Sequence, residues 1–490
     1  MKKGIWLLLG ALSALIVLLI LRAFTVFEDN QVVPDKAFEP LLLNETAVVE
    51  RLANAIRFPT ISYEESNKFD KSAFMGLHEF IETSYPLVHQ HMRKTVIGEY
   101  SLVYELPGAS STLKPVLFMG HIDVVPVDEA TRSQWLHEPF SGDISDDAIW
   151  GRGALDDKVT VFALLEAMEH LLAKGLTPTR SVYFSFGHDE EIGGEQGAAQ
   201  VADWFAEQNI QFEFVLDEGG AITRDLMVGT DKTVAVVGIA EKGYANVRLT
   251  INDDGGHSSQ PPEHTAVGVL SQAIVKLENN QFPTDFQFIN KTFDRIGHYT
   301  DFPTRVAMSN LWLLSPLIEG VMLSKPSSAA SIRTTTAATM VEGSSKSNIL
   351  PTQAIGVINY RLMPGTSIAD LIEHVTTTIN DDRVNIDVYM ANEASKVSTM
   401  ESMGYRLIEQ TIRTMQNDTL VAPYLVQGGT DAKHFTALSD SIYRFMMVEL
   451  NPKTLKQFHG VNEQIPIKDY LSAIQFYGEL IKQSAHVEQN

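Results

Sequence analysis

The chain has 490 residues, of which 44% are hydrophobic and 20% charged, a composition typical of globular proteins and unlike disordered or fibrous chains. A net charge of −23 would repel phosphate backbones, so no nucleic-acid partner is expected. The chain contains no cysteine, which excludes disulfides, thiolate nucleophiles and cysteine-based zinc sites. Any bound metal must therefore be held by His, Asp and Glu, and two domains are expected at this length.

The amino terminus begins with an uncharged apolar run, residues 4–21, preceded by Lys2 and Lys3. At about 1.5 Å per residue this run is just long enough to cross a bilayer, and the lysines favour a cytoplasmic N-terminus. We expect residues 1–25 to be an uncleaved single-pass membrane anchor, with a cleaved signal peptide as the alternative. Either interpretation places the catalytic part outside the cytoplasm, in a periplasmic, luminal or extracellular space, and cleavage would make it secreted.

The next part of the chain alternates apolar strands with helices. Helices are predicted at residues 44–58 and 159–172, and strands at residues 115–120, 181–187 and 212–216. This alternation indicates an α/β fold with a central, mostly parallel sheet that is covered on both faces.

The pattern changes near residue 241. Residues 245–251 and 354–362 alternate like half-solvated strands, and residues 266–277 and 368–379 read as helices. Two strands with helices to one side indicate a smaller α+β sandwich inserted in the larger domain. We therefore expect a catalytic domain in two parts around an inserted lid, with boundaries at residues 40–240, 241–390 and 391–486.

The first chemical motif is MGHIDVVP, at the end of the strand predicted over residues 115–120. His121 and Asp123 are separated by one residue, so in extended backbone they point the same way. A histidine and a carboxylate on one side suit a metal ligand and the group that orients it, and open α/β sheets bind ligands at the carboxyl ends of their strands. Alone, the motif is more often a loop histidine with no metal.

Asp156 and Asp157 follow in WGRGALDDK, just before a predicted helix. The glycines do not form a dinucleotide-binding loop, because Asp156 takes the place of the third glycine in GxGxxG. Helix capping by one aspartate and metal binding by the other are both compatible with this position.

Further carboxylates gather at the ends of the next two predicted strands. Glu190 and Glu191 lie in GHDEEIGG, and Asp217 and Glu218 lie in LDEGG. Crowded carboxylates raise one another's pKa, and a divalent cation relieves that cost, although a solvated acidic turn is the alternative. One glutamate can bind metal while its neighbour acts as a base. The distant HGVNE motif supplies His459, and His434 is a further candidate ligand.

Taken in this order, the motifs resemble those of the zinc metallopeptidase family that includes aminoacylase, glutamate carboxypeptidase and acetylornithine deacetylase. The GHDEE and GGTDA sequences are most similar to those of the branch that contains carboxypeptidase S and N-fatty-acyl-amino-acid hydrolase. The resemblance implies two Zn²⁺ ions per subunit and an Asp156–Asp157 cis peptide bond. It assigns His121 and Glu218 to one zinc, with Asp217 as the alternative to Glu218. It assigns His459 and Glu191 to the other zinc, with Asp156 as the bridge. Asp123 would orient His121, and Glu190 would be the general base.

In the inserted domain, the resemblance implies substrate contacts from His257, Asn348 and Arg361, and Gly429 lies in a matching substrate-binding loop. It also implies a homodimer formed through this lid, with His257 reaching an active site across the dimer. The expected activity is cleavage of an amide or peptide bond beside a free carboxylate, in a small peptide or an N-acyl amino acid.

Other functional classes fit the sequence less well. No GxSxG nucleophile elbow and no HExxH helix are present, which argues against a serine hydrolase and a zincin. A non-catalytic metal- or peptide-binding ectodomain on the same fold would be expected to lose a ligand or the base, and here all of them are present.

Overall fold

The computed structural model describes residues 2–486. Its larger sheet has ten strands in the order β1-β2-β6-β3-β7-β17-β9-β8-β18, with β16 paired to β9. The strands are β1 (Arg93–Ile97), β2 (Ser101–Leu106), β3 (Val116–His121), β6 (Val182–Gly187), β7 (Phe214–Asp217), β8 (Ala221–Thr223), β9 (Val234–Glu241), β16 (Leu420–Val426), β17 (Ile442–Arg444) and β18 (Glu449–Leu450). The central strands β6, β3, β7 and β17 are parallel, which confirms the predicted α/β class.

Helices cover both faces of this sheet, because its strands are apolar on both sides. In β3, Phe118 belongs to the core beneath α5, whereas Leu117 and Met119 belong to a second core beneath α6. The helices of this domain are α2 (Glu45–Ile56), α3 (Lys71–Ser84), α4 (Pro86–His91), α5 (Lys158–Ala173), α6 (Ala198–Glu207), α13 (Met403–Met415) and α14 (Ile467–Ala485). Asn44 caps α2, and its side chain accepts a hydrogen bond from the Ala47 amide.

A small three-stranded sheet joins distant parts of the chain. It consists of β4 (Asp143–Ser145), β5 (Ala148–Trp150) and β19 (Gln464–Pro466) in the order β19-β5-β4. Pairing of Gln464 with Trp150 brings the HGVNE segment beside the loop that carries Asp156.

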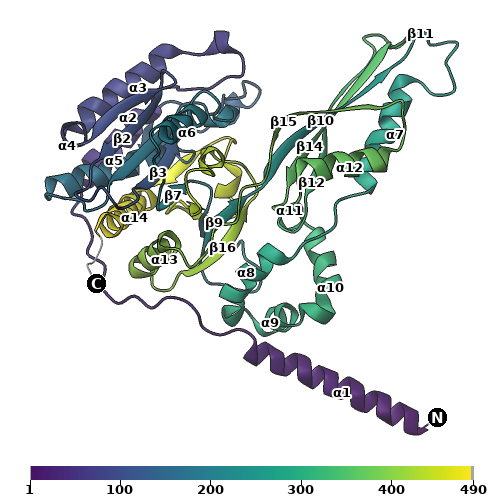
Figure 1. Cartoon of the computed structure of the whole chain (residues 1–490), viewed down its shortest axis with the longest axis horizontal. Coiled ribbons are helices and arrows are strands. Elements are labelled where there is room, and N and C mark those ends of the chain that lie inside the picture. Colours follow the sequence, from purple (N-terminus) through teal and green to yellow (C-terminus); the bar gives the residue numbers. More distant parts are fainter. Residues whose placement is uncertain (1, 487–490) are drawn as a thin grey trace.

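The second sheet has four antiparallel strands in the order β12-β14-β10-β15 and its own apolar core. The strands are β10 (Gly243–Asn252), β12 (Thr335–Glu342), β14 (Gln353–Leu362) and β15 (Asn385–Asn392), and the core lies beneath α7 (Ala266–Asn279) and α12 (Ile368–Ile379). The sequence predicted two of these strands and both helices. A two-stranded ribbon, β11 (Gly256–His257) and β13 (Ile349–Leu350), lies at the outer end of this sheet (Figure 1).

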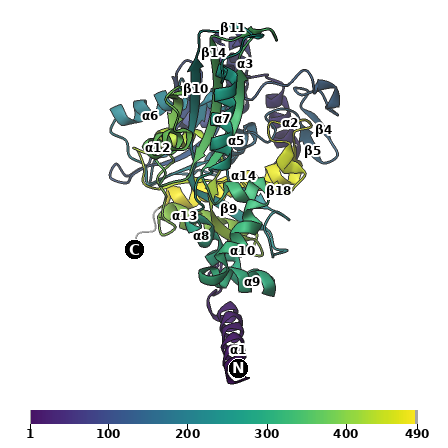
Figure 2. The same cartoon turned by 90° about the vertical axis from the view of Figure 1, so that its right-hand side faces the viewer.

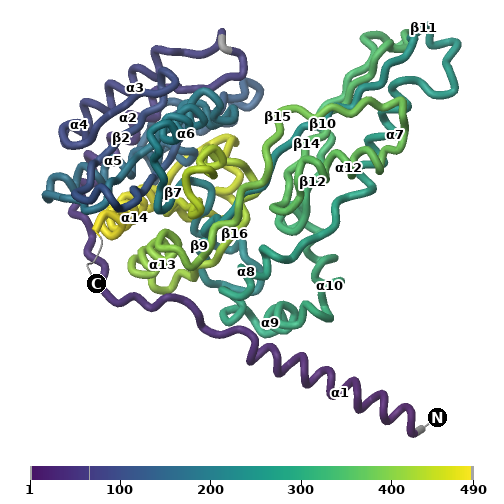
Figure 3. Tube along the Cα trace, viewed as in Figure 1, coloured from purple at the N-terminus to yellow at the C-terminus, as the bar shows by residue number. Residues whose placement is uncertain are grey.

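The chain passes from β9 into the second sheet and returns through β15 to α13 and β16 (Figure 3). The domain boundaries at residues 240 and 390 stay a prediction. Between the two sheets lie helices that were not predicted: α8 (Gln287–Ile296), α9 (Phe302–Ser309), α10 (Leu311–Leu323) and α11 (Pro326–Ala330). Of these, α8 packs against the larger sheet, where the Thr292 hydroxyl donates to the Pro423 carbonyl at 2.7 Å.

The apolar amino terminus forms α1 (Lys2–Thr25), which projects from α9 away from both sheets (Figures 1 and 2). Within the described residues, this is the one unbroken helix that is long and apolar enough to cross a membrane.

Candidate metal centre and active site

The predicted site residues converge at one edge of the larger sheet. His121 is the last residue of β3, η3 (Glu190–Ile192) follows β6, and Glu218 follows β7. Because these three strands are parallel neighbours, their carboxyl ends meet at the same edge. The topology therefore gathers side chains that are far apart in the sequence.

A first group of potential metal ligands consists of His121, Asp156 and Glu218. Their ligand atoms lie within 4.8 Å of one another, and His121 Nε2 lies 3.0 Å from Asp156 Oδ1. His121 is buried, with 1% of its side chain exposed. Such spacing can be spanned by a single ion bound to all three side chains.

A second group shares Asp156 and adds Glu191 and His459. His459 Nε2 lies 3.1 Å from Asp156 Oδ2 and 3.0 Å from Glu191 Oε2. Each oxygen of Asp156 thus faces a different histidine. This arrangement fits a carboxylate that bridges two metal ions.

Asp217, the alternative to Glu218, points elsewhere. Its Oδ2 accepts a hydrogen bond from the Ala432 amide at 2.8 Å, and its Oδ1 accepts one from the Glu218 amide at 3.0 Å. Asp217 therefore holds the loop around Ala432, and Glu218 is the member of the pair that lies with His121 and Asp156. His434 lies outside both groups, with its Nε2 3.0 Å from the Gly193 carbonyl oxygen.

Asp123 is buried behind His121 and holds two parts of the site together. Its Oδ1 lies 3.3 Å from His121 Nδ1. Its two oxygens also accept hydrogen bonds from the backbone amides of Glu190 at 3.2 Å and Glu191 at 3.1 Å, and the Ser62 hydroxyl donates to it at 2.6 Å. The same carboxylate thereby fixes the imidazole and the short helix that carries both glutamates.

Asp157 follows Asp156 through a cis peptide bond, as the family resemblance implied. It occupies the N-cap position of α5, yet its side chain makes no capping hydrogen bond. Instead Asp157 is buried, and its Oδ2 lies 3.4 Å from the His121 amide nitrogen. The capping alternative for this carboxylate is thus not realised.

The charges of the site are unbalanced without a cation. Among residues 2–486, the ion-pair partners of Asp156, Glu190 and Glu191 are histidines. Burial raises the pKa of Glu190 and Glu218 well above the ordinary value, and nearby carboxylates raise it further. The buried Oε1 of Glu191 has no hydrogen-bond partner. Divalent cations would supply the missing positive charge and ligand bonds.

Nearby carboxylates raise the pKa of both histidines of the site. Hydrogen bonds with Asp156 and Glu191 raise the pKa of His459 to about 10. Burial lowers the pKa of His121, but Asp123 and Asp156 outweigh burial and hold it well above the ordinary value. Metal binding requires neutral imidazoles, so a metal would displace these protons.

Glu463, in HGVNE, is a site residue whose role the sequence did not reveal. Its Oε1 accepts hydrogen bonds from the amides of Gly153 at 2.9 Å, Leu155 at 2.9 Å and Asp156 at 3.2 Å. Its Oε2 lies 2.6 Å from Arg152 Nη1, and both side chains are almost fully buried. Glu463 thus shapes the loop that presents Asp156. The sequence offered only a weak sign of this role: two glycines in the loop before Asp156, and an acidic residue without an assigned role in HGVNE.

The predicted lid residues His257 and Asn348 are not brought to this edge within one chain. Both are exposed, and the Asn348 carbonyl accepts a hydrogen bond from the Ser258 amide beside the β11–β13 ribbon. This ribbon lies at the outer end of the second sheet, far from the carboxyl ends of β3 and β7 (Figure 1).

Arg361 lies at the opposite end of the second sheet. It pairs with Tyr244 across β14 and β10, and its guanidinium lies 4.7 Å from the centre of the Tyr244 ring. The neighbouring Lys242 is buried and donates to the Arg333 carbonyl at 2.6 Å. Burial, together with Arg361 and Arg333, lowers the pKa of Lys242 to about 7. A cluster of cations therefore lies where the second sheet joins the first.

The loop that contains Gly429 is anchored beside these cations. Glu241, at the end of β9, accepts hydrogen bonds from the Thr430 amide at 3.1 Å and the Thr430 hydroxyl at 2.9 Å. Glu241 also pairs with the buried Arg444 at 3.3 Å. A Cβ at Gly429 would meet no other atom within 4 Å, so the backbone is open to solvent there.

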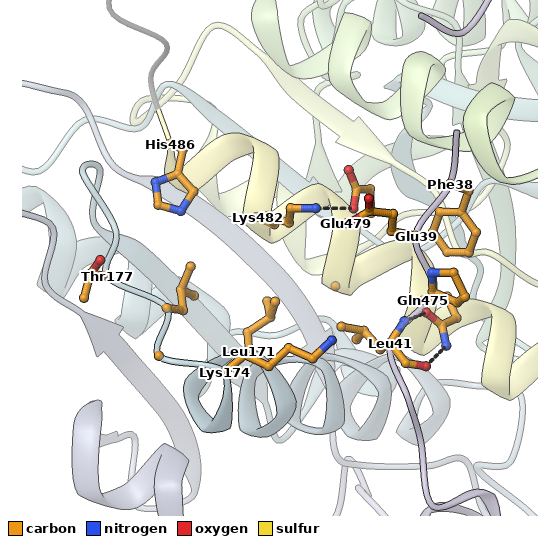
Figure 4. A pocket seen from close by; sticks show the side chains of 14 residues that line it. Phe38, Glu39, Leu41, Leu171, Lys174, Thr177, Gln475, Glu479, Lys482 and His486 are labelled. Atoms are coloured by element: carbon orange, nitrogen blue, oxygen red, sulfur yellow. Dashed lines mark hydrogen bonds and ion pairs between the residues drawn. The ribbon is translucent and has the colours of Figure 1, made fainter. Parts of the chain in front are cut away.

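A separate cavity of about 420 Å³ lies between the residues that follow α1 and the helices α5 and α14 (Figure 4). Leu41, Leu171 and Lys482 line it, and it contains none of the predicted site residues.

An α/β sheet that carries two His–carboxylate groups joined by one aspartate defines a metal-dependent hydrolase. Comparison with known proteins agrees with this class: the model of peptidase family M20/M25/M40 matches residues 117–483. The chain belongs to this family of peptidases.

Relatives are similar over nearly their whole length. A probable carboxypeptidase S-like protein of Dictyostelium discoideum is 42% identical, over 92% of this chain and 87% of the relative. An N-fatty-acyl-amino acid synthase/hydrolase of Xenopus tropicalis is 38% identical, over 89% of this chain and 86% of the relative. Among solved structures, an M20 family metallo-carboxypeptidase from Sulfolobus solfataricus has the same fold, with a TM-score of 0.64 at 19% identity over 91% of this chain and all of that one.

Proposed function

We propose that this chain is a dinuclear zinc hydrolase that cleaves the amide bond next to a free carboxylate. The observation that carries the proposal is the position of Asp156, with one oxygen 3.0 Å from His121 and the other 3.1 Å from His459. A carboxylate placed in this way suits two ions that share a bridge. Imidazole and carboxylate ligands without thiolates are compatible with zinc.

In this proposal, His121, Asp156 and Glu218 hold one ion, and Asp156, Glu191 and His459 hold the other. Zinc bound at these positions would lower the pKa of a water molecule and polarise the scissile carbonyl. Glu190, which approaches His121 Nε2 to 4.0 Å, accepts the proton of the attacking water and delivers it to the leaving amine nitrogen.

Arg361 binds the free carboxylate of the substrate. A guanidinium can form two parallel hydrogen bonds to a carboxylate, and stacking on Tyr244 fixes its plane. Lys242 and Arg333 add positive potential at the same place. This cationic cluster supports the preference for substrates that end in a carboxylate.

The remaining lid residues act in a homodimer. Because His257 and Asn348 lie at the outer end of the second sheet, they serve the active site of the other subunit. There, His257 of the partner subunit donates a hydrogen bond to the oxyanion that forms on the carbonyl.

N-acyl amino acids and small peptides are the two substrate classes, since the similar proteins are a probable carboxypeptidase and an N-fatty-acyl-amino acid synthase/hydrolase. We further propose that α1 remains attached and anchors the chain in a membrane, with its N-terminus cytoplasmic and the catalytic part on the other side.

Hydrolysis assays with the full chain in detergent test the proposal. The panel contains blocked dipeptides and N-acyl amino acids of increasing chain length, each with a matched amide in place of the free carboxylate. We expect cleavage that stops with a chelator, returns with zinc and fails for the amides. Absence of any cleavage with two metals bound would favour a non-catalytic binding protein on this fold.

A further inference from the structure

The helix α10 presents an uninterrupted apolar stripe to solvent. Trp312, Leu317 and Val321 are 58%, 66% and 63% exposed, and Leu313 and Pro316 lie on the same face. Residues spaced by three and four positions line one side of a helix. On a helix that faces water, this side carries polar residues, whereas here it is apolar from end to end. We call these five residues the outer stripe.

The one charged residue of α10 does not interrupt the outer stripe. Glu319 is half-buried, and its Oε1 accepts a hydrogen bond from the Thr284 hydroxyl at 2.8 Å. The acid is therefore satisfied on the side of α10 that faces the protein, and the outer stripe carries no charge.

The outer stripe lies next to the apolar amino-terminal helix. α9 and α10 meet at a bend of 116°, and α9 packs on the end of α1. There, the Arg22 guanidinium donates to the Ser309 carbonyl at 3.1 and 3.0 Å, and the Asn310 amide group donates to the Leu19 carbonyl at 3.0 Å. These contacts fix the start of α10 beside the last turns of α1, and Figures 1 and 2 show α1, α9 and α10 in that order.

Exposed aromatic residues continue the apolar surface between the two helices. The rings of Phe24 on α1 and Phe302 on α9 are 5.5 Å apart, and they are 64% and 44% exposed. A contiguous apolar surface of this kind marks an interaction site. α1 itself has a mean hydropathy of 2.7 and no buried residue in its most apolar window.

We propose that α10 is a second membrane-binding element, which lies in the surface of a phospholipid bilayer with the outer stripe among the acyl chains. A bilayer that α1 enters must begin near α9, because the residues after Thr25 lead back to the folded domains. α10 starts at that level, its apolar side is unpartnered, and Trp312 suits the boundary between headgroups and acyl chains. Two attachments would restrict rotation of the catalytic domain about α1.

The contact is apolar and not electrostatic. The chain has a net charge of −23, so anionic lipid would not attract it, and the outer stripe has no basic residue. Neutral phosphatidylcholine is therefore a sufficient partner, and the contact persists at high salt.

Site-specific labelling tests this proposal, because the chain has no cysteine. The full chain carries a nitrobenzoxadiazole label at Leu317→Cys on the outer stripe, at Leu12→Cys on α1, or at Met75→Cys on α3. Met75 is the matched control, a helical apolar residue with 54% exposure in the larger domain. Each variant is reconstituted in phosphatidylcholine vesicles with and without doxyl-labelled lipid.

We expect doxyl lipid to quench the label at position 317 several-fold more than the label at position 75, at low and high salt alike. Equal quenching at positions 317 and 75 would overturn the proposal. A blue-shifted label at position 317 that lipid does not quench would also overturn it, and would indicate that a second copy of the chain covers α10. The label at position 12 reports on α1 separately, so failure of the anchor is distinguishable from failure of α10.

Discussion

The paired carboxyl groups Glu190 and Glu191 differ in what their side chains can reach. Glu191 Oε2 lies 3.0 Å from His459 Nε2, whereas Glu190 Oε2 approaches His121 Nε2 only to 4.0 Å. This difference supports the roles proposed for them, with Glu191 as a metal ligand and Glu190 as the general base. Their shared support is Asp123, which accepts a hydrogen bond from both backbone amides.

Replacing Glu190 by Gln keeps the shape of the side chain and removes its basicity. We expect turnover to fall by about 100- to 10,000-fold, the usual contribution of a general base, while both metals remain bound. Steady-state rates and metal content per chain, measured on the same preparation, check this. A Glu190→Gln chain that turns over like the wild type would show that another group takes the proton.

Glu463 is a second residue whose removal has a distinct outcome. Burial raises its pKa to about 7, so at alkaline pH a charged carboxylate faces the buried Arg152. Replacing Glu463 by Gln removes the charge that pairs with this guanidinium, although the Gly460 carbonyl still accepts a hydrogen bond from it at 3.0 Å. At alkaline pH, the loss of the charge costs about 3–5 kcal/mol of folding free energy, and the substitution loosens the loop that carries Asp156. We expect a lower thermal midpoint and weaker zinc affinity.

The matched control for Glu463 is Glu449→Gln, because Glu449 pairs with Arg224 at the surface, where such pairs contribute about 0–1 kcal/mol. A thermal midpoint that falls equally in both variants would contradict the role given to Glu463.

At the scale of elements, α3 contains a histidine that makes the fold sensitive to acid. His78 is buried, and its Nε2 lies 2.9 Å from the Tyr100 carbonyl oxygen. Burial lowers its pKa from 6.5 to about 4. Between these two pH values the unfolded chain binds a proton that the folded chain does not, so stability falls as the pH falls through this window.

A His78→Gln variant keeps a donor for the Tyr100 carbonyl and does not titrate. We expect its thermal midpoint to decline less than that of the wild type between pH 6.5 and about 4. Parallel curves for the two proteins would show that another group controls the acid response, since metal loss and the other carboxylates affect both chains alike.

The elements that the sequence predicted are those with regular patterns. β14 alternates buried and half-buried residues over most of AIGVINYRL, and Ser367 caps α12 with a capping box. β12 was missed because Thr335–Glu342 is an edge strand that is largely exposed on both faces. Its sequence therefore need not alternate apolar and polar residues. α10 was missed because Leu311–Leu323 is almost entirely apolar and has too few polar side chains to show an amphipathic period.

The residues grouped at the candidate site could be found from the sequence because they sit in short motifs at strand ends, and their roles stay a prediction. The residues alone could not separate Asp217 from Glu218, since adjacent residues differ only in the direction that backbone pairing gives them, and the family resemblance favoured Glu218. The role of Glu463 was also hidden, because it depends on β19 pairing with β5, a contact between segments that are distant in the sequence.

At the scale of the whole molecule, the β11–β13 ribbon lies far from the metal ligands, and the proposed homodimer would bring it to the active site of a partner subunit. Mixing two inactive chains tests this. Glu190→Gln lacks the base but retains His257, and His257→Ala has the reverse defect. In a mixed two-fold dimer one site regains both groups, so we expect about a quarter of wild-type activity after random exchange of subunits.

The control for this experiment is each variant mixed with itself, which should stay inactive. A mixture that also remained inactive, although the subunits had exchanged, would show that His257 serves the active site of its own chain.

Whether two ions share Asp156 can be tested by a crystal structure of the zinc-loaded chain, through anomalous difference density recorded at the zinc edge. We predict two peaks per subunit on either side of Asp156, one beside His121 and Glu218 and the other beside Glu191 and His459. One peak alone, or peaks away from Asp156, would contradict the dinuclear centre and the chemistry proposed for it.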